Sequence, residues 1–292
     1  MFSIFVYLVR PLFLLSVILL YLLGIGMARY NGASLNWDLA LLGLLWLLAL
    51  QLGGLFLHAY FDIRLGSTPK EENGENLPVQ LSRSARLLIA YAFLAAVASL
   101  SVLLIRVVDI PAIFLLMTVM ACGALCYPVP PFRLEYSGYG ELLLSLLVAN
   151  LTPALGYQLQ GGDSIRFLAM VTFPLTALHL AMLLAISLST YAGDLKYGRR
   201  TLITRMGWQN GMLLHNILIL VAYLLLMAAI TFGLPWRIGV PAFLTLPVGI
   251  RQIWTVNRIA AGAKPVWKSL TVMAVALFNI TVYLLAFSLW IN

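Results

Sequence analysis

The stretch DLALLGLLWLLALQLGGLFLHAY, residues 38–60, decides the fold class of this chain, because it carries a single Asp, Glu, Lys or Arg in its whole length. A helix needs about 20 mostly apolar residues to cross the hydrocarbon core of a bilayer. The same criterion applied outward finds eight further segments, and we predict an all-helical bundle of nine transmembrane helices. The predicted spans are residues 8–28, 38–60, 86–105, 110–127, 141–160, 166–189, 212–232, 237–253 and 268–290.

The composition points the same way. The chain has 292 residues, of which 62% are hydrophobic and 10% charged, with a mean hydropathy of +0.98. Soluble domains carry roughly 25% charged residues, so lipid must cover much of this surface. We expect a single integral membrane domain over residues 1–292. The first segment is interpreted as a span, because no small-residue cleavage site follows residues 21–26.

Positive charge divides unevenly between the two sides of the predicted bundle. With nine spans, 14 of the 18 Lys and Arg residues fall on the side of the N-terminus. Cytoplasmic loops are enriched in Lys and Arg, so we predict a cytoplasmic N-terminus, long cytoplasmic loops and an external C-terminus. The net charge of +8 fits attraction to anionic lipid, and nothing in the sequence indicates a nucleic-acid partner.

Polar side chains follow two of the predicted helices toward the cytoplasmic side. Gln51, His58 and Asp62 share one face at the end of the second span. His179 and Thr190 share a face of the sixth span, and Asp194 lies beyond it. Polar groups at membrane depth are costly and usually face a cavity or a partner helix. The two stripes favour one shared cavity, although buried His and Asn side chains also serve simply to join helices.

The segment DLKYGRRTLITRMG, residues 194–207, follows the second stripe and contains four cations. One interpretation is a phosphate-binding cluster, since arginine binds phosphate in bidentate geometry. The other is a set of positive charges that anchors the loop at the inner membrane face. The sequence leaves these two interpretations about equal. The cations are Lys196, Arg199, Arg200 and Arg205.

Three segments together resemble the UbiA superfamily of intramembrane prenyltransferases, and most of all the 1,4-dihydroxy-2-naphthoate polyprenyltransferases. HAYFDIRLGS, residues 58–67, is placed like the family's N-D-x-x-D signature. YPVPPFRLEYSGYGEL, residues 127–142, resembles its tyrosine–proline–arginine loop, and residues 194–207 resemble its second acidic segment. The resemblance implies nine helices around a cavity open to the cytoplasm. It further implies Mg²⁺ ions that bind the diphosphate of a polyprenyl donor, and an aromatic acceptor that the prenyl group alkylates.

The resemblance also assigns roles to residues of this chain. Asp62 and Asp194 take the catalytic and metal-binding positions. The implied diphosphate-binding residues are Arg64, Arg133, Lys196, Arg199, Arg200 and Arg205. The implied cavity and acceptor residues are Gln51, His58, Tyr60, Tyr127, Asn150, His179 and Thr190.

Several acidic positions of the family pattern are changed in this chain. His58 and Ala59 replace the leading Asn and Asp of the first motif, and Thr190 replaces the leading Asp of the second. Glu135 stands where the family usually has a lysine, which places a negative charge where a diphosphate would favour a positive one. At the two acidic motifs, carboxylates are lost. Fewer carboxylates are therefore available for a hard cation such as Mg²⁺.

Two functions follow as hypotheses. The first is an atypical prenyltransferase of quinone or related lipid biosynthesis in a bacterial or archaeal plasma membrane. The second is a catalytically inactive relative that binds a quinone, isoprenoid or pigment, or that acts as a subunit of a larger membrane complex. The retained basic segment favours the enzyme, and the missing acids favour the inactive relative. A transporter is a weaker third hypothesis.

Overall fold

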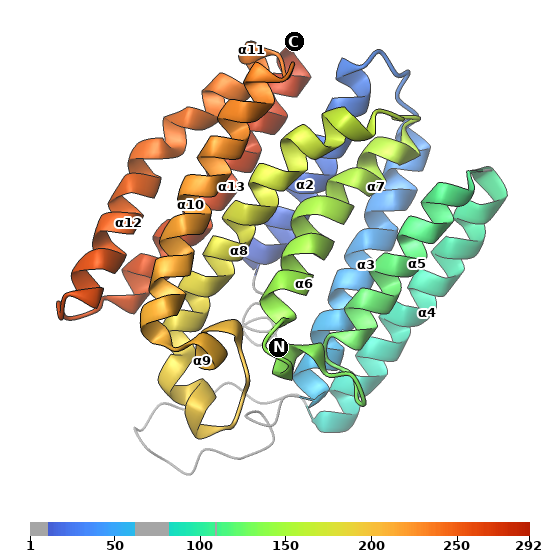
Figure 1. Cartoon of the computed structure of the whole chain (residues 1–292). Coiled ribbons are helices and arrows are strands. Elements are labelled where there is room, and N and C mark those ends of the chain that lie inside the picture. The colour runs from blue at the N-terminus through green and yellow to red at the C-terminus, as the bar shows by residue number, and fades with distance from the viewer. Residues whose placement is uncertain (1–10, 62–81, 109) are drawn as a thin grey trace.

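The computed structural model describes residues 11–61, 82–108 and 110–292. This part of the chain is helical and contains no strand. The helices lie side by side in one bundle (Figure 1). Their bounds are α2 (Pro11–Tyr30), α3 (Trp37–Phe61), α4 (Arg83–Val107), α5 (Pro111–Cys126), η2 (Leu134–Tyr136), α6 (Gly140–Leu146), η3 (Leu147–Leu151), α7 (Thr152–Leu159), α8 (Ile165–Lys196), α9 (Leu202–Met206), α10 (Trp208–Thr231), α11 (Trp236–Gly239), η4 (Val240–Thr245), α12 (Leu246–Ala260) and α13 (Trp267–Ile291).

Within the described ranges, seven stretches are long and apolar enough to cross a membrane. They are α2, α3, α4, the stretch from α6 to α7, α8, α10 and α13. The fourth predicted span coincides with α5, a shorter apolar helix. The eighth is divided into α11, η4 and α12, because Pro241 and Pro247 each lack the N–H that a continuous helix requires. The chain is an integral membrane protein.

The predicted sixth span is longer in the structure than in the sequence analysis. It was expected to end at residue 189, with Asp194 in the loop beyond, but α8 continues to Lys196. Thr190 and Asp194 therefore lie one turn apart on the same helix, and the Thr190 hydroxyl donates a hydrogen bond to Asp194 Oδ2 over 2.8 Å. The criterion of apolar length missed this last turn because Thr190, Asp194 and Lys196 interrupt the apolar run, although the helix continues through them.

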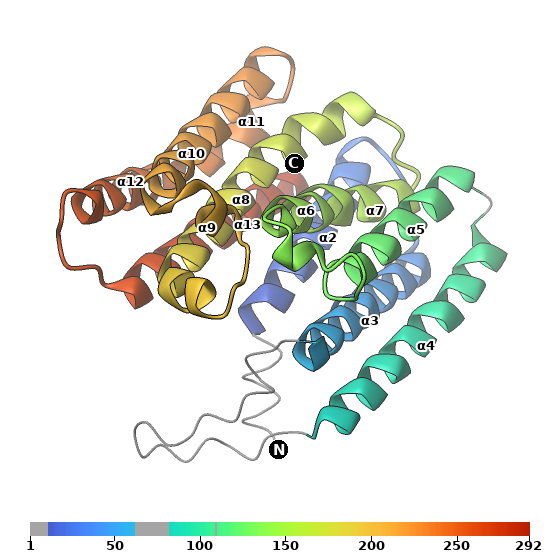
Figure 2. The same cartoon turned by 60° about the horizontal axis from the view of Figure 1, so that its bottom comes forward.

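Two large apolar clusters make most of the core, and α2 contributes to both, while a smaller cluster lies between α3 and α4. One cluster joins α2 to α8, α10 and α13, and the other joins α2 to α3, α4, α5 and α7. α4 packs mainly on α3 and lies at the rim of the bundle (Figure 2). The end of the bundle at the bottom of Figure 1 holds α9 and the connection from α5 to α6. The two polar stripes predicted from the sequence run toward this end of the bundle.

Two glycines allow α2 and α7 to approach closely. A Cβ on Gly156 would lie 2.6 Å from the carbonyl oxygen of Tyr21, and one on Gly24 would overlap the carbonyl of Pro153. Small residues are the usual means of bringing membrane helices into contact. This contact places α7 beside α2 and α3, where Thr152 and the end of α6 reach the interior.

Replacing Gly24 by valine is expected to destabilise the protein by about 1–3 kcal/mol, because the added side chain must push apart two packed backbones. Thermal unfolding in a fixed detergent measures the loss. Gly193→Ala is the matched control, since its Cβ meets no atom within 4 Å, and it should leave the unfolding temperature unchanged or slightly raised. An equal loss in both variants would contradict the close-packing explanation.

Candidate active site

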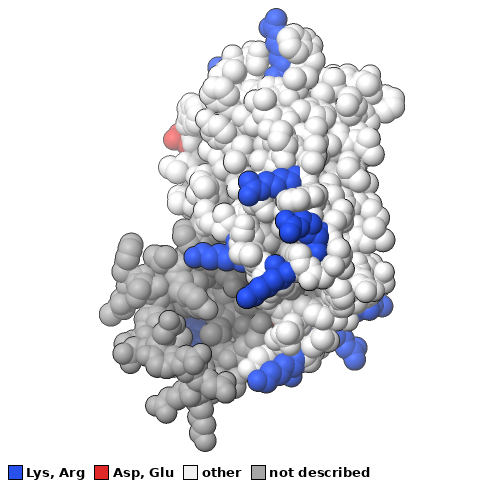
Figure 3. Space-filling view, turned by 90° about the vertical axis from the view of Figure 1, so that its left-hand side faces the viewer, with Lys and Arg blue, Asp and Glu red and all other residues white. Residues whose placement is uncertain are grey.

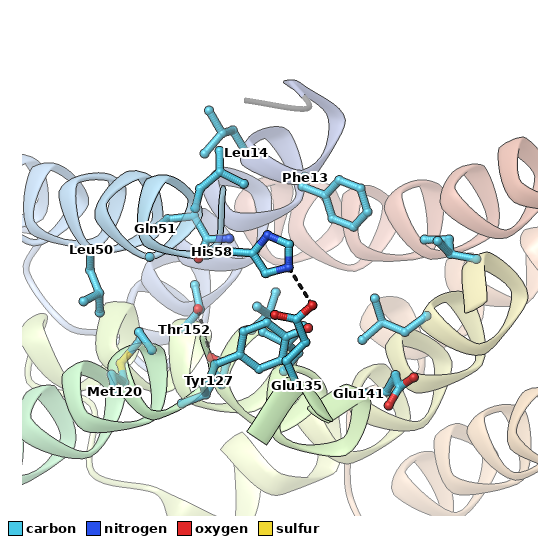
Figure 4. Close-up of a pocket in the computed structure, with 18 of the residues that line it drawn as sticks. Phe13, Leu14, Leu50, Gln51, His58, Met120, Tyr127, Glu135, Glu141 and Thr152 are labelled. Carbon is cyan, nitrogen blue, oxygen red and sulfur yellow. Dashed lines mark hydrogen bonds and ion pairs between the residues drawn. The ribbon is translucent and has the colours of Figure 1, made fainter. Parts of the chain in front are cut away.

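A cavity of about 470 Å³ lies between α2, α3, α5, α6 and α8. Most of its wall is apolar, and polar side chains gather in one part of it (Figure 4). The wall is mostly apolar because these helices lie within the membrane, where they pack against one another and against lipid. The lining residues are Phe13, Leu14, Leu47, Leu50, Gln51, Gly54, Leu55, His58, Ala59, Met120, Ala124, Tyr127, Glu135, Glu141, Leu144, Leu147, Val148, Thr152, Leu183, Ile186, Ser187, Thr190 and Arg199.

Glu135 is the centre of the polar part. Its Oε1 atom lies 2.9 Å from Nε2 of His58 and 2.8 Å from a guanidinium nitrogen of Arg199. The Glu135 side chain is 3% exposed, and that of Arg199 is 18% exposed. One buried carboxylate thus joins α3 to the segment that follows α8. Paired and hydrogen-bonded charges of this kind are how a protein tolerates an ion away from water.

The loop between α5 and α6 holds Glu135 in place. The Glu135 amide donates to the carbonyl oxygen of Tyr127 over 3.1 Å, and Glu135 sits on the short helix η2. Arg133 enters that helix at a φ of 37°, a left-handed conformation that is uncommon for a residue with a side chain. The ring of Tyr127 stacks on His58 with a centroid separation of 6.1 Å. The tyrosine–proline–arginine loop therefore builds one wall of the cavity.

A second buried carboxylate, Glu141, begins α6. Its Oε1 accepts a hydrogen bond from the Ser187 hydroxyl over 3.1 Å, and its two oxygens lie 3.3 and 3.2 Å from the amide of Leu202. A carboxylate near the first turn of a helix is favourable, because the N–H groups there are positive. Glu141 thus fixes α8 and α9 against α6 and adds another acid to the cavity wall.

Asp194 lies beside this polar region and is fully buried. Besides the bond from Thr190, its Oδ1 lies 3.9 Å from a guanidinium nitrogen of Arg199. Arg199 therefore stands between Asp194 and Glu135, and its charge is shared by two acids. Among the predicted phosphate-binding cations, Arg199 is the one that lines the cavity within the described residues.

Five of the residues expected at the site line the cavity: Gln51, His58, Tyr127, Thr190 and Arg199. Asp62 and Arg64 lie outside the described residues, so the expected approach of Asp62 to Asp194 stays a prediction. Asp194 lies beside the cavity, and the remaining expected residues lie elsewhere in the described structure.

Two of these form contacts between helices. The Asn150 amide donates to Thr172 over 3.0 Å. His179 pairs with the Ser145 hydroxyl over 3.1 Å and packs edge-on against Phe278. Both side chains satisfy the polar groups of neighbouring helices, which is the other interpretation that the sequence left open.

The other expected residues lie near the ends of the helices. Arg133 donates to the Phe61 carbonyl at the end of α3 over 2.9 Å, and helix C-termini favour such cations. Tyr60 lies against Phe61 and under the guanidinium of Arg83. Lys196 lies over the ring of Tyr197. Arg200 and Arg205 line a separate recess with Ser137 and Thr204.

Sequence reasoning missed Glu141 and did not find the partners of Glu135. The sequence shows Glu135 as a negative charge near the expected diphosphate site, and the structure adds that it is the partner of Arg199 and His58. A signal was present in the sequence: Glu135 and Glu141 are the acids of the segment 127–142, which also contains an arginine and several aromatic residues. A buried acid in such a loop requires a cation or several donors.

The described residues do not by themselves make a metal site. Across residues 11–61, 82–108 and 110–292, no group of three or more His, Cys, Asp or Glu side chains is arranged to hold a metal ion. Glu135 is already bound to Arg199, and Mg²⁺ prefers carboxylate oxygens and water in near-octahedral geometry. Asp194 would need ligands from outside the described part of the chain.

Fold and site together define a helical membrane protein with a largely apolar interior cavity and buried charge in one part of its wall. Residues 17–274 match the model of the UbiA prenyltransferase family. The chain belongs to this family.

A curated relative and several solved structures are similar to the chain. It is 31% identical over 153 residues to 2-carboxy-1,4-naphthoquinone phytyltransferase, chloroplastic, of Arabidopsis thaliana, which covers 48% of this chain and 39% of that protein. A UbiA homologue from Archaeoglobus fulgidus bound to GPP and Mg²⁺ has a TM-score of 0.68 at 19% identity, with 99% of both chains covered. An apo UbiA homologue from Aeropyrum pernix K1 has a TM-score of 0.61 at 14% identity, with 94% and 97% covered. The two structures establish the fold.

Proposed function

We propose that the protein is a prenyltransferase that moves a polyprenyl group from its diphosphate to an aromatic acceptor of quinone or related lipid biosynthesis. The supporting observation is the cavity, in which one set of walls is apolar and buried charges gather in another part of the wall. An isoprenoid tail requires the first environment, and an ionising diphosphate with a hydroxylated ring requires the second. The curated relative, named as a phytyltransferase of a carboxylated naphthoquinone, supports the same reaction class.

Each step of the proposed reaction is assigned to residues of this chain. The allylic C–O bond of the donor breaks and its electron pair leaves with the diphosphate, toward Arg199 and the basic residues beyond it. Glu135 and Glu141 place negative charge near the allylic carbon as it becomes positive, which is the electrostatic form of catalysis. The acceptor ring forms the new C–C bond, and His58, bound to Glu135, accepts the proton that the ring loses.

Mg²⁺ is a proposed cofactor, with Asp62 and Asp194 as its ligands. The Archaeoglobus fulgidus homologue with GPP was solved with Mg²⁺, which supports this proposal for the family. When bound, such an ion would neutralise charge on the leaving diphosphate. We further propose nine membrane crossings in a bacterial or archaeal plasma membrane, with the cavity, the N-terminus and the basic loops toward the cytoplasm.

The direct test incubates the purified protein with geranyl diphosphate, Mg²⁺ or Mn²⁺ and a series of hydroxylated naphthalenes and benzenes. Metal-dependent release of diphosphate together with a prenylated product is the expected result. A folded protein that releases no diphosphate with any pair of substrates would contradict the proposal.

Filling the cavity is expected to remove most of the turnover while the fold is kept. Gly54 lines the cavity, and a Cβ there meets one neighbouring atom, at 3.9 Å. In Gly54→Leu the added side chain therefore occupies part of the cavity in which the substrate is proposed to bind. The prenylated product is measured beside the unfolding temperature. Leu41→Phe is the control on the same helix, because Leu41 is 56% exposed on the outer face, and it should keep its turnover. Full activity in Gly54→Leu would place the substrate elsewhere.

A second candidate function is binding without turnover, as an inactive relative that holds a quinone or isoprenoid or serves as a membrane subunit. The contacts of Arg199 with Glu135 and Asp194 favour it, because two acids already offset the charge of this cavity cation. In that case a quinone or polyprenol would bind the wild-type protein and not Gly54→Leu, and no diphosphate would be released by either.

A further inference from the structure

The part of the chain that follows Asp194 has basic residues and no acidic ones. Residues 195–292 contain nine Lys and Arg residues and no Asp or Glu. The helices of this region therefore have no acidic partner of their own. Arg199 finds its acids in earlier segments, as described above, but the basic residues of α12 lie on the outside of the bundle. Among the described residues, no acidic side chain forms an ion pair with them.

Polar contacts set the rotation of α12 on the bundle. Gln252 is 1% exposed and pairs with Nε2 of His215 over 2.9 Å. Asn257 accepts from the Asn216 amide over 2.7 Å. Gly249 packs against Tyr223 on α10. Hydrogen bonds between membrane helices fix their orientation, and these bonds turn one face of α12 inward against α10.

The opposite face of α12 is basic and aromatic. Arg251, Trp254 and Arg258 are all exposed, and their spacing of three, four and seven residues places them on one side of the helix. The guanidinium of Arg258 lies 4.9 Å from the centre of the Trp254 ring. Lys264 and Lys268 follow, both exposed. On this side of the molecule several basic side chains gather in one part of the surface, and an acidic side chain is visible only at the edge of the view (Figure 3).

This face does not suit the hydrocarbon interior. α12 is not among the helices apolar enough to cross a membrane, and an arginine in contact with lipid tails is strongly disfavoured. Tryptophan is enriched where the tails meet the headgroups, and arginine binds phosphate oxygens in bidentate geometry. About 10 Å of helix separates Arg251 from Arg258, at 1.5 Å per residue. The two guanidinium groups are therefore far enough apart to bind separate phosphate groups.

We propose that Arg251, Trp254 and Arg258 form a docking surface for the phosphate headgroups of anionic phospholipids, which Lys264 and Lys268 extend. The lipid supplies the negative charge that the C-terminal third of the chain lacks. The end of α12 that carries Arg258 then lies at the headgroup boundary of the bilayer, and Gln252 and His215 hold the helix to the bundle from inside. This surface is separate from the cavity, and it serves an enzyme or an inactive relative equally.

The test measures lipid binding by the full-length protein in detergent micelles, using native mass spectrometry. Phosphatidylglycerol is titrated against phosphatidylcholine of the same chain length. The wild-type protein is expected to retain phosphatidylglycerol preferentially, and added salt should weaken that binding. In the double variant Arg251→Gln/Arg258→Gln the affinity should fall about 25-fold, at about fivefold for each cation near an anionic surface.

Arg237→Gln is the matched control. Arg237 is an exposed arginine on α11 and lies 5.8 Å from the ring of Trp236, so it offers the same pair of side chains without a second basic residue on its helix. Its affinity for phosphatidylglycerol should change less than twofold. All three replaced arginines are exposed, so each variant should keep the wild-type unfolding temperature in phosphatidylcholine.

Three outcomes would overturn the proposal. One is a wild-type protein that does not distinguish the two lipids, and another is an equal loss in Arg237→Gln, which would mean that charge alone acts. The third is competition by inorganic phosphate or by geranyl diphosphate at the concentration of the lipid, which would assign the surface to a soluble anion.

Discussion

Replacing Glu135 by alanine is expected to lower the free energy of unfolding by about 3–5 kcal/mol, the cost of breaking a buried ion pair by removing one partner. Glu135 is 4% exposed and accepts from both Arg199 and His58. Without its carboxylate, the Arg199 charge stays in the cavity wall with Asp194 as its described ion-pair partner, at 3.9 Å. Chemical unfolding in detergent, followed by circular dichroism, measures the loss.

Glu135→Gln is the control for this prediction. The amide has nearly the shape of the carboxylate and can accept one of the two hydrogen bonds, so the loss should be clearly smaller than in Glu135→Ala. A double-mutant cycle with Arg199→Ala separates the pair from its surroundings. Additive losses in Glu135→Ala and Arg199→Ala would show that the 2.8 Å contact contributes nothing measurable.

Replacing Asp194 by asparagine is expected to reduce turnover by roughly 10²–10³-fold or more, the scale seen when a group that stabilises developing charge is removed. The amide side chain of this variant can still accept the hydrogen bond from the Thr190 hydroxyl, so its shape and position should be kept. What disappears is the negative charge that we propose as a ligand of Mg²⁺. Diphosphate release over a range of Mg²⁺ concentrations measures the effect.

Thr190→Val isolates the hydrogen bond from the charge. It removes the hydroxyl group that donates to Asp194 over 2.8 Å and keeps the carboxylate. Turnover should therefore fall far less than in Asp194→Asn. Excess Mg²⁺ should restore part of the Thr190→Val rate and little of the Asp194→Asn rate. If Asp194→Asn kept the wild-type rate and the same dependence on Mg²⁺, Asp194 would not be a metal ligand.

Most of the fold followed from local properties of the sequence. Each of the nine predicted spans overlaps helix in the described structure, and seven of these stretches are long and apolar enough to cross a membrane. Residues 38–60 coincide almost fully with α3. The errors lie where an apolar run and a helix do not have the same bounds. α8 continues through polar residues to Lys196, and two prolines divide the eighth predicted span. Hydropathy measures the transfer of side chains into lipid, whereas a helix ends where its backbone hydrogen bonds end.

The site was only partly accessible from the sequence. Helical spacing placed Gln51 and His58 on one face, and both line the cavity. The same argument placed His179 with Thr190, but His179 lies against Ser145 and Phe278. A helical phase tells which residues share a face, and it does not tell which neighbour that face meets. The basic segment likewise contained Arg199 and Arg205, of which Arg199 alone lines the cavity.

The sequence by itself determined that this chain is a helical membrane protein of the UbiA family with basic loops, because apolar length, charge and motif order are read along the chain. Only the tertiary structure decided that Glu135 joins His58 to Arg199, residues 77 and 64 positions away. The physical reason is that a buried charge is stabilised by whatever lies within about 3 Å of it. That neighbourhood is created by the packing of distant helices.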